Sequence, residues 1–288
     1  MKWFHPKFID NDGWLHLKVG ISTMLDRVGI ARKVEHQRRR FEQVHTYCLF
    51  IGYPRSGHSV VGSVIDAHPN ALMAHRLDSL QYVARGYSAL EVFYLIARNS
   101  ERFARSGRQL TGYRYNVPNQ WHGRDQVLSV VGDQEGNRSS VRLARDPGLL
   151  RPLVDGSRVK VRFIHVIRNP FDNITTWALR DQSTLERSVE RYFSRCANVM
   201  QIKQSTPPGD LLDIRHEEFV SNFDAECRKL LGFLSLDVSD EFVTDCASIV
   251  YHSPHRSRTQ IEWPRRLIEQ TEARFAEYPF LSGYRFAD

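Results

Sequence analysis

Three short apolar runs in the chain are each followed by residues at helical spacing, and they define the expected secondary structure. Residues 47–51 form the first run, which ends at Gly52. An apolar run that is stopped by glycine is typical of a strand buried on both faces of a parallel sheet. Apolar residues then recur at the spacing of one helix face until Pro69, at Val60, Val61, Val64 and Ile65. The segment after Gly52 therefore joins a strand to the amino terminus of a helix.

Two further strand–loop–helix units follow the first one. Residues 161–167 predict a second strand, and Pro170 is well placed to open the next helix because proline is favoured at the first helical position. Residues 211–214 predict a third strand, with a helix after it through Cys227 and Leu231. Strands that alternate with helices predict a central parallel sheet flanked by helices. We therefore expect a single α/β domain over residues 1–288.

Two stretches lie outside this alternation. Residues 1–45 are expected to form an amino-terminal helical extension, with an amphipathic helix near residues 25–41. Residues 86–156 are less regular and are rich in glycine, arginine, asparagine and glutamine. We expect this second stretch to be an inserted loop-and-helix region that covers one end of the sheet and shapes a binding site there.

The composition is typical of a folded soluble protein, and the net charge favours one class of binding partner. The 288 residues are 41% hydrophobic and 25% charged, which excludes a disordered or coiled-coil chain. No apolar run approaches the ~18 residues of a membrane helix, and residues 1–14 lack the apolar core of a secretory signal, so we expect a cytoplasmic protein. The net charge of +7 favours anionic partners. The four cysteines have no CxxC spacing, so we expect buried thiols and no metal site.

The segment after the first strand has the spacing of a phosphate-binding loop, Gly-Tyr-Pro-Arg-Ser-Gly-His-Ser over residues 52–59. His58 stands where such loops carry lysine. The backbone N–H groups at a helix amino terminus still form a cradle for anionic oxygens, and Arg55 offers a cation from another side. The second strand ends in Arg168 rather than in a magnesium-binding aspartate. Both departures disfavour a magnesium-dependent ATPase or kinase.

A second set of polar residues follows the strand at residues 161–167. Arg168 stands at the end of the strand, and Thr176 lies eight residues later in the following helix. Ligands bind at this edge of an open parallel sheet. Arginine suits a phosphate because its planar fork donates several hydrogen bonds, and the threonine hydroxyl can donate beside it. The two loops together predict a site for a nucleotide that is phosphorylated at both ends.

These two motifs, in this order, resemble those of the sulfotransferases that use 3′-phosphoadenosine 5′-phosphosulfate (PAPS). In that family the first loop looks like YP(K/R)SG(T/S)(T/S) and the second motif like RxPxDxxxS. The resemblance implies a P-loop-like fold and a 5′-phosphosulfate site made by Arg55, Ser56, Gly57, His58 and Ser59. It also implies that Arg168 and Thr176 hold the 3′-phosphate. Two residues depart from the family pattern, because Thr176 replaces a serine and His58 replaces a threonine or serine.

Further resemblances lie toward the carboxyl terminus. Residues 215–219, Arg-His-Glu-Glu-Phe, are similar to the family's Arg-Tyr-Glu-Asp-Leu segment, which implies that His216 lies beside the nucleotide. Arg256 and Arg258 resemble the late loop that closes over the 3′-phosphate, although the family's Arg-Lys-Gly form is missing. Residues 281–284 resemble the ending of carbohydrate sulfotransferases.

Sulfuryl transfer needs an aligned acceptor, a base for its proton and positive charge near the leaving group. We expect Arg55 and the loop N–H groups to stabilise the leaving group without a metal. A histidine suits the role of base because its ordinary pKa is about 6.5. His75 follows the loop helix closely and has Asp78 three residues on, while His122 in the inserted region is the main competitor. Any one of the twelve histidines can equally be a structural residue.

The sequence therefore predicts a PAPS-dependent sulfotransferase that acts on a hydroxyl or an amine of a small soluble acceptor. Two alternatives stay open: a small-molecule kinase or nucleoside triphosphatase, and a basic nucleic-acid-binding protein without enzymatic activity. The missing lysine argues against the first alternative. The second lacks the interleaved aromatic and basic motifs of RNA-binding proteins and any zinc pattern. The identity of the acceptor and the oligomeric state stay open at this level.

Overall fold

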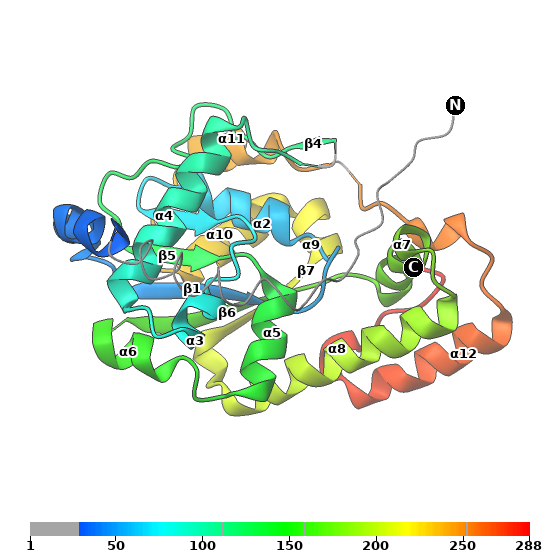
Figure 1. Ribbon diagram of the computed structural model, residues 1–288. Coiled ribbons are helices and arrows are strands. Elements are labelled where there is room, and N and C mark those ends of the chain that lie inside the picture. Colours follow the sequence, from blue (N-terminus) through cyan, green and yellow to red (C-terminus); the bar gives the residue numbers. More distant parts are fainter. Residues whose placement is uncertain (1–28, 111, 158, 252) are drawn as a thin grey trace, which may run out of the picture.

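The computed structural model describes residues 29–110, 112–157, 159–251 and 253–288. Its centre is a parallel sheet of five strands in the order β2-β5-β1-β6-β7 (Figure 1). The strands span Ala71–Ala74 (β2), Val130–Asp133 (β5), Thr46–Ile51 (β1), Lys160–Ile167 (β6) and Leu211–Arg215 (β7). The three strands predicted from the apolar runs are β1, β6 and β7. The expected α/β fold class, with helices around a parallel sheet, is confirmed.

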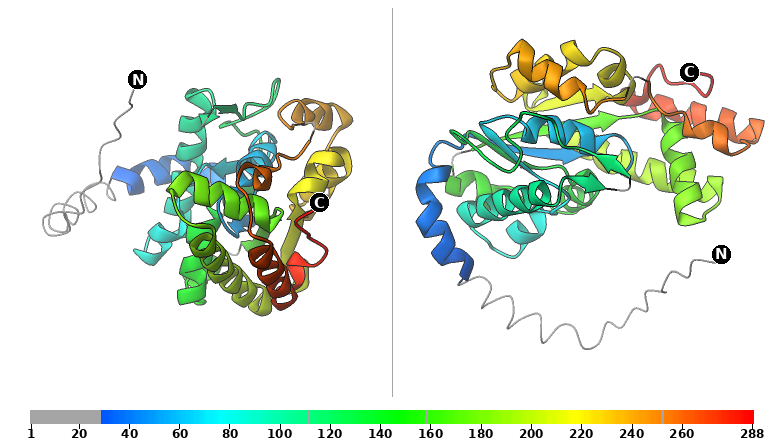
Figure 2. Two further views of the ribbon diagram at one scale, coloured as in Figure 1. Left: turned by 90° about the vertical axis from the view of Figure 1, so that its right-hand side faces the viewer. Right: turned by 90° about the horizontal axis from the view of Figure 1, so that it is seen from above.

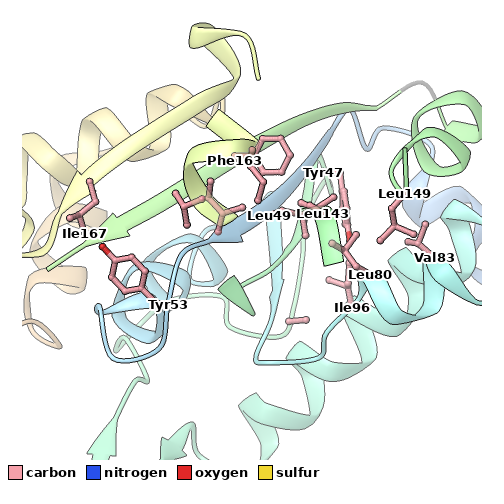
Figure 3. Close-up of a cluster of buried hydrophobic side chains, with 14 of the residues drawn as sticks. Tyr47, Leu49, Tyr53, Leu80, Val83, Ile96, Leu143, Leu149, Phe163 and Ile167 are labelled. Carbon is pink, nitrogen blue, oxygen red and sulfur yellow. The ribbon is translucent and has the colours of Figure 1, made fainter. Parts of the chain in front are cut away.

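Helices cover both faces of the sheet, and an apolar core lies against each face. Figure 1 shows α2 and α10 above the sheet and α5 and α8 below it. The upper core includes side chains of α2 (His58–Asp66), α10 (Phe223–Phe233) and α11 (Asp240–Ala247). The lower core includes side chains of α3 (Leu80–Ala84), α4 (Ala89–Arg105), α5 (Gly136–Arg145), α6 (Arg151–Ser157) and α8 (Leu185–Ser205). Figure 3 shows part of the lower core, where Leu143 of α5 lies near Leu49 of β1.

The strand β1 lies in the middle of the sheet, and both of its faces are covered. All six of its residues are buried, and it pairs with β5 on one side and with β6 on the other. A strand without polar positions has no face to offer to water. Because β1 and β6 are parallel neighbours, their carboxyl ends lie at the same edge of the sheet, where the chain continues into loops.

The remaining elements complete the two ends of the molecule. They are α7 (Pro170–Asp181), α9 (His216–Ser221), α12 (Arg265–Ala273) and the 3₁₀ turns Arg38–Phe41, Pro208–Asp210, Ser257–Gln260, Arg274–Glu277 and Pro279–Leu281. Residues 29–37 are helical, and the earlier part of the predicted amino-terminal helix lies outside the described residues. This helix and α12 lie at opposite ends of the molecule (Figures 1 and 2).

The structure changes the interpretation of residues 86–156. This stretch contributes α4, a short antiparallel pair of β3 (Gln109–Leu110) and β4 (Tyr113–Arg114), and also β5, which lies between β2 and β1 in the main sheet. The expectation of a loop-and-helix insertion is therefore wrong for β5, which is a core strand. The β3–β4 hairpin is the part of this stretch that stands over the carboxyl edge of the sheet.

Two predictions from composition can be compared with the described residues. Cys48, Cys196, Cys227 and Cys246 are free and buried, as expected for reduced thiols in apolar surroundings. Within residues 29–288, apart from the three single gaps, no helix has the length and apolar character that crossing a bilayer requires.

Candidate active site

The loop between β1 and α2 bends at glycines and leaves the backbone N–H groups at its end, residues 56–59, without a partner among the described residues. Gly52 and Gly57 have φ angles of +124° and +104°, and Arg55 has a φ of +72°. Glycine adopts such angles readily, whereas arginine does so at a cost. No group within the described residues accepts a hydrogen bond from the backbone N–H groups of residues 56–59. Four unpaired donors at the amino terminus of α2 form a cradle for an anion.

The side chain of Ser56 turns away from this cradle. It is fully buried, donates to the carbonyl oxygen of Tyr53 at 3.1 Å, and accepts from Nδ2 of Asn173 at 3.0 Å. Trp177 of the same helix, α7, donates from Nε1 to the carbonyl oxygen of Pro54 at 3.2 Å. These bonds fasten the loop to α7. Ser56 can therefore contribute its backbone N–H, while its hydroxyl holds the loop in shape.

Arg168 connects the end of β6 to the same loop. Its guanidinium donates to the carbonyl oxygen of Arg55 at 3.1 Å, to the carbonyl oxygen of His255, and to the hydroxyl of Ser257 at 3.3 Å. Its Nε is buried and has no partner among the described residues. Burial lowers the pKa of Arg168 from its ordinary value, because the charged form loses hydration. Arg168 is thus a buried cation whose Nε–H is unused.

A pocket of about 810 Å³ opens above the loop and contains Arg168 in its wall. Its lining comes from the 52–59 loop, the β3–β4 hairpin, the turn between β5 and α5, the end of α7, the start of α9 and residues 249–256. Seven arginines line it: Arg55, Arg76, Arg114, Arg168, Arg180, Arg191 and Arg256. Glu135 and Asp181 are the acidic residues of this lining, and so the described wall carries an excess of positive charge.

His216 forms the floor of the pocket next to Gly57. A Cβ placed on Gly57 would lie 2.5 Å from Nδ1 of His216, so the loop needs glycine here for space as well as for its φ angle. This Nδ1 is buried and has no partner among the described residues. Burial, followed by the charge of Arg168, lowers the pKa of His216 to about 3. The imidazole is therefore neutral and can donate or accept one hydrogen bond to a ligand.

Not every residue predicted for the 3′-phosphate reaches the pocket. Arg168 and Arg256 line it, whereas Thr176 and Arg258 do not. The Thr176 hydroxyl donates to the carbonyl oxygen of Asp172 at 2.7 Å. Arg258 is buried and forms an ion pair with the Asp172 carboxylate at 2.6 Å. The prediction for Arg258 is corrected by this contact, because its guanidinium is used to hold residues 257–260 against α7.

The three residues predicted as base or base partner lie outside the pocket lining. His122 is buried, accepts from the backbone N–H of Val117 at 2.8 Å, and faces the Asp66 carboxylate at 3.4 Å. Asp78 receives two hydrogen bonds from Arg142, at 2.9 and 2.7 Å. Both groups are held by partners in the fold, and the structure does not bring them to the pocket.

His75 lies one residue behind the pocket wall. Its ring stacks on Phe103 with centroids 4.0 Å apart, and its Nδ1 contacts the amide of Gln134, which does line the pocket. Burial lowers the pKa of His75 to about 4. Its imidazole can therefore reach a bound molecule only through Gln134.

Several lining residues were not found from the sequence. Tyr113 and Tyr251 are two of them, and with Tyr115 they form an aromatic wall, in which the Tyr113 ring lies 6.3 Å from that of Tyr115 and 5.7 Å from that of Tyr251. Glu135 lies just after β5, at the same edge of the sheet at which Gly52 follows β1. It was missed because β5 was not recognised as a strand. Arg180 lies one helical turn beyond Thr176 on α7, and this spacing is the signal that could have identified it.

Comparisons with known proteins agree with this arrangement. The sequence model of the "Sulfotransferase family" matches residues 160–240, from the start of β6 to the start of α11. A search of the curated proteins found none that matches the chain. The sulfotransferase domain from the curacin biosynthetic pathway matches with a TM-score of 0.52 and 13% identity, over 82% of this chain and 98% of that domain.

Two other solved structures are similar to smaller degrees. A sulfotransferase from Mycobacterium tuberculosis H37Rv has a TM-score of 0.49 and 8% identity, over 86% of this chain and 81% of that one. The sulfotransferase domain from the Synechococcus PCC 7002 olefin synthase has a TM-score of 0.45 and 14% identity, over 78% of this chain and 83% of that one. The match to the curacin domain shows that the fold is the one found in sulfotransferases. Residues 160–240 are thus similar in sequence to the sulfotransferase family, and the chain as a whole has a fold found in sulfotransferases.

Proposed function

We propose that the chain transfers a sulfuryl group from PAPS to a hydroxyl or an amine of a small soluble acceptor, in the cytoplasm and without a metal ion. One observation carries the proposal. The unpaired N–H groups of residues 56–59 belong to the loop whose residues 57–59 line a pocket, and Arg168 lines the same pocket, at the ends of two adjacent parallel strands. Two anion-binding positions at one sheet edge fit a nucleotide with phosphates at both ends.

The residues present fit the 5′ side of such a nucleotide. The four N–H groups of residues 56–59 can bind the oxygens of the 5′-phosphosulfate, and Arg55 adds positive charge at the rim of the cradle. Nδ1 of His216 is a buried polar atom without a partner in the described chain, which an additional ligand contact would satisfy. PAPS supplies an activated sulfuryl group and a phosphate leaving group when it is bound.

The 3′ side is served by arginines from two segments. Arg168 offers its unused Nε, and the exposed Arg256 lies in the same pocket wall. Thr176 would have to give up its bond to the Asp172 carbonyl to take part. We therefore assign the 3′-phosphate to Arg168 and Arg256 first, and Thr176 to a secondary contact.

The protein's own groups can supply most of what the transfer requires. Arg55 and the loop N–H groups oppose the negative charge that develops on the leaving phosphate. The Tyr113, Tyr115 and Tyr251 wall stands across the pocket and can orient an acceptor against the loop. Positioning and fixed charge are the main contributions expected of the enzyme in such a transfer.

The other two function classes have less support. A nucleoside triphosphatase or kinase of this loop type uses a lysine at the position of His58. A nucleic-acid-binding protein would need its cations on an open face, whereas seven arginines here line a concave pocket. We therefore propose a small molecule, and neither nucleic acid nor a lipid surface, as the partner.

The nucleotide preference of the protein tests this proposal. We expect the wild type to bind 3′-phosphoadenosine 5′-phosphate more tightly than adenosine 5′-phosphate, because Arg168 and Arg256 face the position of the added phosphate. Arg168→Ala should weaken binding of the doubly phosphorylated nucleotide by about 2–4 kcal/mol, the range for loss of a charge-assisted contact. Isothermal titration calorimetry measures both affinities.

Arg85→Ala is the matched control, since Arg85 is exposed and bonds only to Gln81 at 3.2 Å among the described residues. It should leave both affinities unchanged. Equal affinity of the wild type for the two nucleotides would contradict the proposal. Because Arg168 also holds the loop, a variant that loses both nucleotides equally would assign Arg168 to loop support and return the 3′-phosphate to Arg256.

A further inference from the structure

Two buried histidine rings meet beside Gly52, and the nucleotide site described above uses neither of them as a base. A Cβ placed on Gly52 would lie 3.3 Å from Nε2 of His58 and 3.6 Å from Nε2 of His165. Both Nε2 atoms are buried and have no partner among the described residues. Two unpaired ring nitrogens that face one point are costly unless a proton or a small polar molecule connects them.

His165 is held in one tautomer by its other nitrogen. Its Nδ1 lies 3.1 Å from the carboxylate of Asp213 on the adjacent strand β7, where the two residues are directly paired. A carboxylate can only accept, so Nδ1 of His165 carries the proton and Nε2 has the free electron pair. Lys203 donates to the same carboxylate, which is 42% exposed and so reaches solvent.

His58 occupies the complementary position on the pocket side. It is the first residue of α2, lines the pocket, and packs its ring edge-on to Phe50 with centroids 5.5 Å apart. Gly136 at the start of α5 leaves space for the ring, since a Cβ there would lie 2.4 Å from its Cε1. With Nε2 turned toward His165, Nδ1 is the nitrogen left for a molecule in the pocket.

The other acid–base groups of the lining have partners elsewhere. Glu135 caps α5 by accepting from the N–H of Arg138 at 3.3 Å. Asp181 is paired with Arg191 at 2.5 Å. His216 lies against Gly57, on the side of the cradle that we assign to the nucleotide. His255 also lines the pocket, but it is exposed and its Nδ1 contacts the Ser257 hydroxyl at 3.0 Å, whereas Nε2 of His58 is buried beside a second histidine ring.

We propose that His58 is the catalytic base of the sulfuryl transfer, and that His165 and Asp213 are positioning residues that carry its proton to solvent. The inference rests on the proposed function. The acceptor O–H or N–H bond breaks, its electron pair stays on the acceptor atom, and the proton bonds to Nδ1 of His58. The Nε2 proton of His58 passes through one water molecule to Nε2 of His165, and the Nδ1 proton of His165 moves to Asp213. Each ring gains one proton at one nitrogen and loses one from the other nitrogen, and the sum is one proton that passes through Asp213 to solvent.

The electrostatics of the three groups agree with this direction. Burial, and then the neighbouring His165, lower the pKa of His58 to about 3, so the ring is in its base form. Burial alone would raise the pKa of Asp213, but His165 and Lys203 outweigh it and lower that pKa to about 2. Asp213 therefore stays ionised at neutral pH, and a proton that reaches it passes on to solvent. The charged groups that act on His165 are Asp213 and Lys203.

A first experiment tests the proton relay without measuring enzymatic turnover. Nitrogen-15 NMR of the histidine rings in the nucleotide-free protein should show His165 protonated at Nδ1 and His58 at Nε2. Asp213→Asn should change the His165 ring signals, whereas Asp210→Asn, which removes another aspartate that pairs with Lys160 at 2.6 Å, should not. A His165 ring protonated at Nε2 in the wild type would overturn the relay.

A second experiment reads the role of His58 in turnover. His58→Ala should lower kcat by ~10²–10⁴-fold with little change in nucleotide affinity, and added imidazole should restore part of the activity. Asp213→Asn should lower kcat by ~10–100-fold at an unchanged KM, while Asp210→Asn keeps the wild-type values. His58→Thr places the family's residue in the loop and should be as slow as His58→Ala.

The outcomes separate the inference from the function on which it rests. If His58→Ala keeps its kcat and Glu135→Gln or His75→Ala is inactive, the base is that residue and the inference fails while the sulfotransferase function stands. Failure of imidazole to rescue His58→Ala, in a variant that still binds 3′-phosphoadenosine 5′-phosphate, also contradicts a base role. A wild type that does not bind this nucleotide contradicts the proposed function, and the ring signals still decide the relay.

Discussion

Asp66 is a fully buried carboxylate in the helix that follows the anion-binding loop. It accepts from Arg108 at 2.5 Å, from the Ser100 hydroxyl at 2.6 Å and from the Met73 backbone N–H at 2.7 Å. Burial alone would raise its pKa, but Arg108 and His122 outweigh that effect and lower it. Arg108 also donates from Nε to the carbonyl oxygen of Tyr115 at 3.2 Å. The carboxylate thus anchors the β3–β4 hairpin to α2.

Removing the cation of this network should destabilise the fold strongly. Arg108→Met leaves the Asp66 carboxylate buried without its charge partner, so the free energy of unfolding at pH 8 should fall by about 3–5 kcal/mol. Urea denaturation followed by circular dichroism measures this change. The exposed Arg85→Met should change it by less than about 0.5 kcal/mol. An equal effect of the two variants would contradict the assigned role of the network.

The pH dependence of the same network has a definite sign. Because the pKa of Asp66 in the folded wild type is below its ordinary value, its contribution is present above pH ~4 and is lost as the pH falls through the folded pKa. In Arg108→Met the lone buried carboxyl should instead take up a proton readily. The loss of stability caused by the substitution should therefore be smaller at pH 5 than at pH 8.

Residue roles were predictable where they follow from the backbone of one motif. The 52–59 loop was found because its spacing sets which N–H groups are free, whichever side chains surround it. The base candidates were not predictable in this way. His122 meets Asp66, which lies 56 positions away in the chain, and Asp78 meets Arg142, which lies 64 positions away. The hydrophobic periodicity near a histidine gives no information about contacts between residues so far apart in the chain.

At the scale of elements, strand length decided what the sequence could reveal. The predicted strands β1, β6 and β7 have five to eight residues, whereas the missed strands β2 and β5 have four each. An apolar run of four residues fits either a buried strand or part of a helix, and residues 211–214 were assigned to a strand because a helical pattern follows them. In β5, Gly132 also resembled a loop residue. The order of the sheet therefore had to come from the structure.

Gly132 is the position at which β5 tolerates no side chain. A Cβ there would lie 2.3 Å from the carbonyl oxygen of Cys48 in β1 and 2.5 Å from Sδ of Met73 in β2. Gly132→Ala should lower the free energy of unfolding by about 1–3 kcal/mol, because it overpacks the middle of the sheet. Chemical denaturation measures the effect.

The matched control for this prediction is Gly232→Ala in α10, where a Cβ would have no neighbour within 4 Å. Alanine in an exposed helical position should raise stability by about 0.5–1 kcal/mol. If both substitutions were stabilising, the conclusion that β5 packs closely between its neighbours would be wrong.

At the scale of the whole molecule, the pocket is assembled from segments that are far apart in the chain. Its lining runs from Pro54 to Arg256, and five of the seven arginines lie outside the two motifs recognised in the sequence. The parallel order of the strands brings these segments to one edge, so the fold class predicts where a site opens. It does not predict which arginines point into it, since that depends on the loops and helix ends around the edge.

The source of positive charge in this pocket gives a prediction that rests on the proposed function. Arg55, Arg168, Arg180 and Arg256 come from four different segments and need no bound metal to place charge around an anionic nucleotide. Sulfuryl transfer should therefore continue at a rate within about twofold of the untreated enzyme when divalent ions are removed with EDTA. The assay is formation of 3′-phosphoadenosine 5′-phosphate with a panel of phenol, alcohol and amine acceptors, with and without EDTA. Complete loss of turnover in EDTA, restored by magnesium, would instead favour the kinase-like alternative, in which a metal ion supplies the charge that we assign to these arginines.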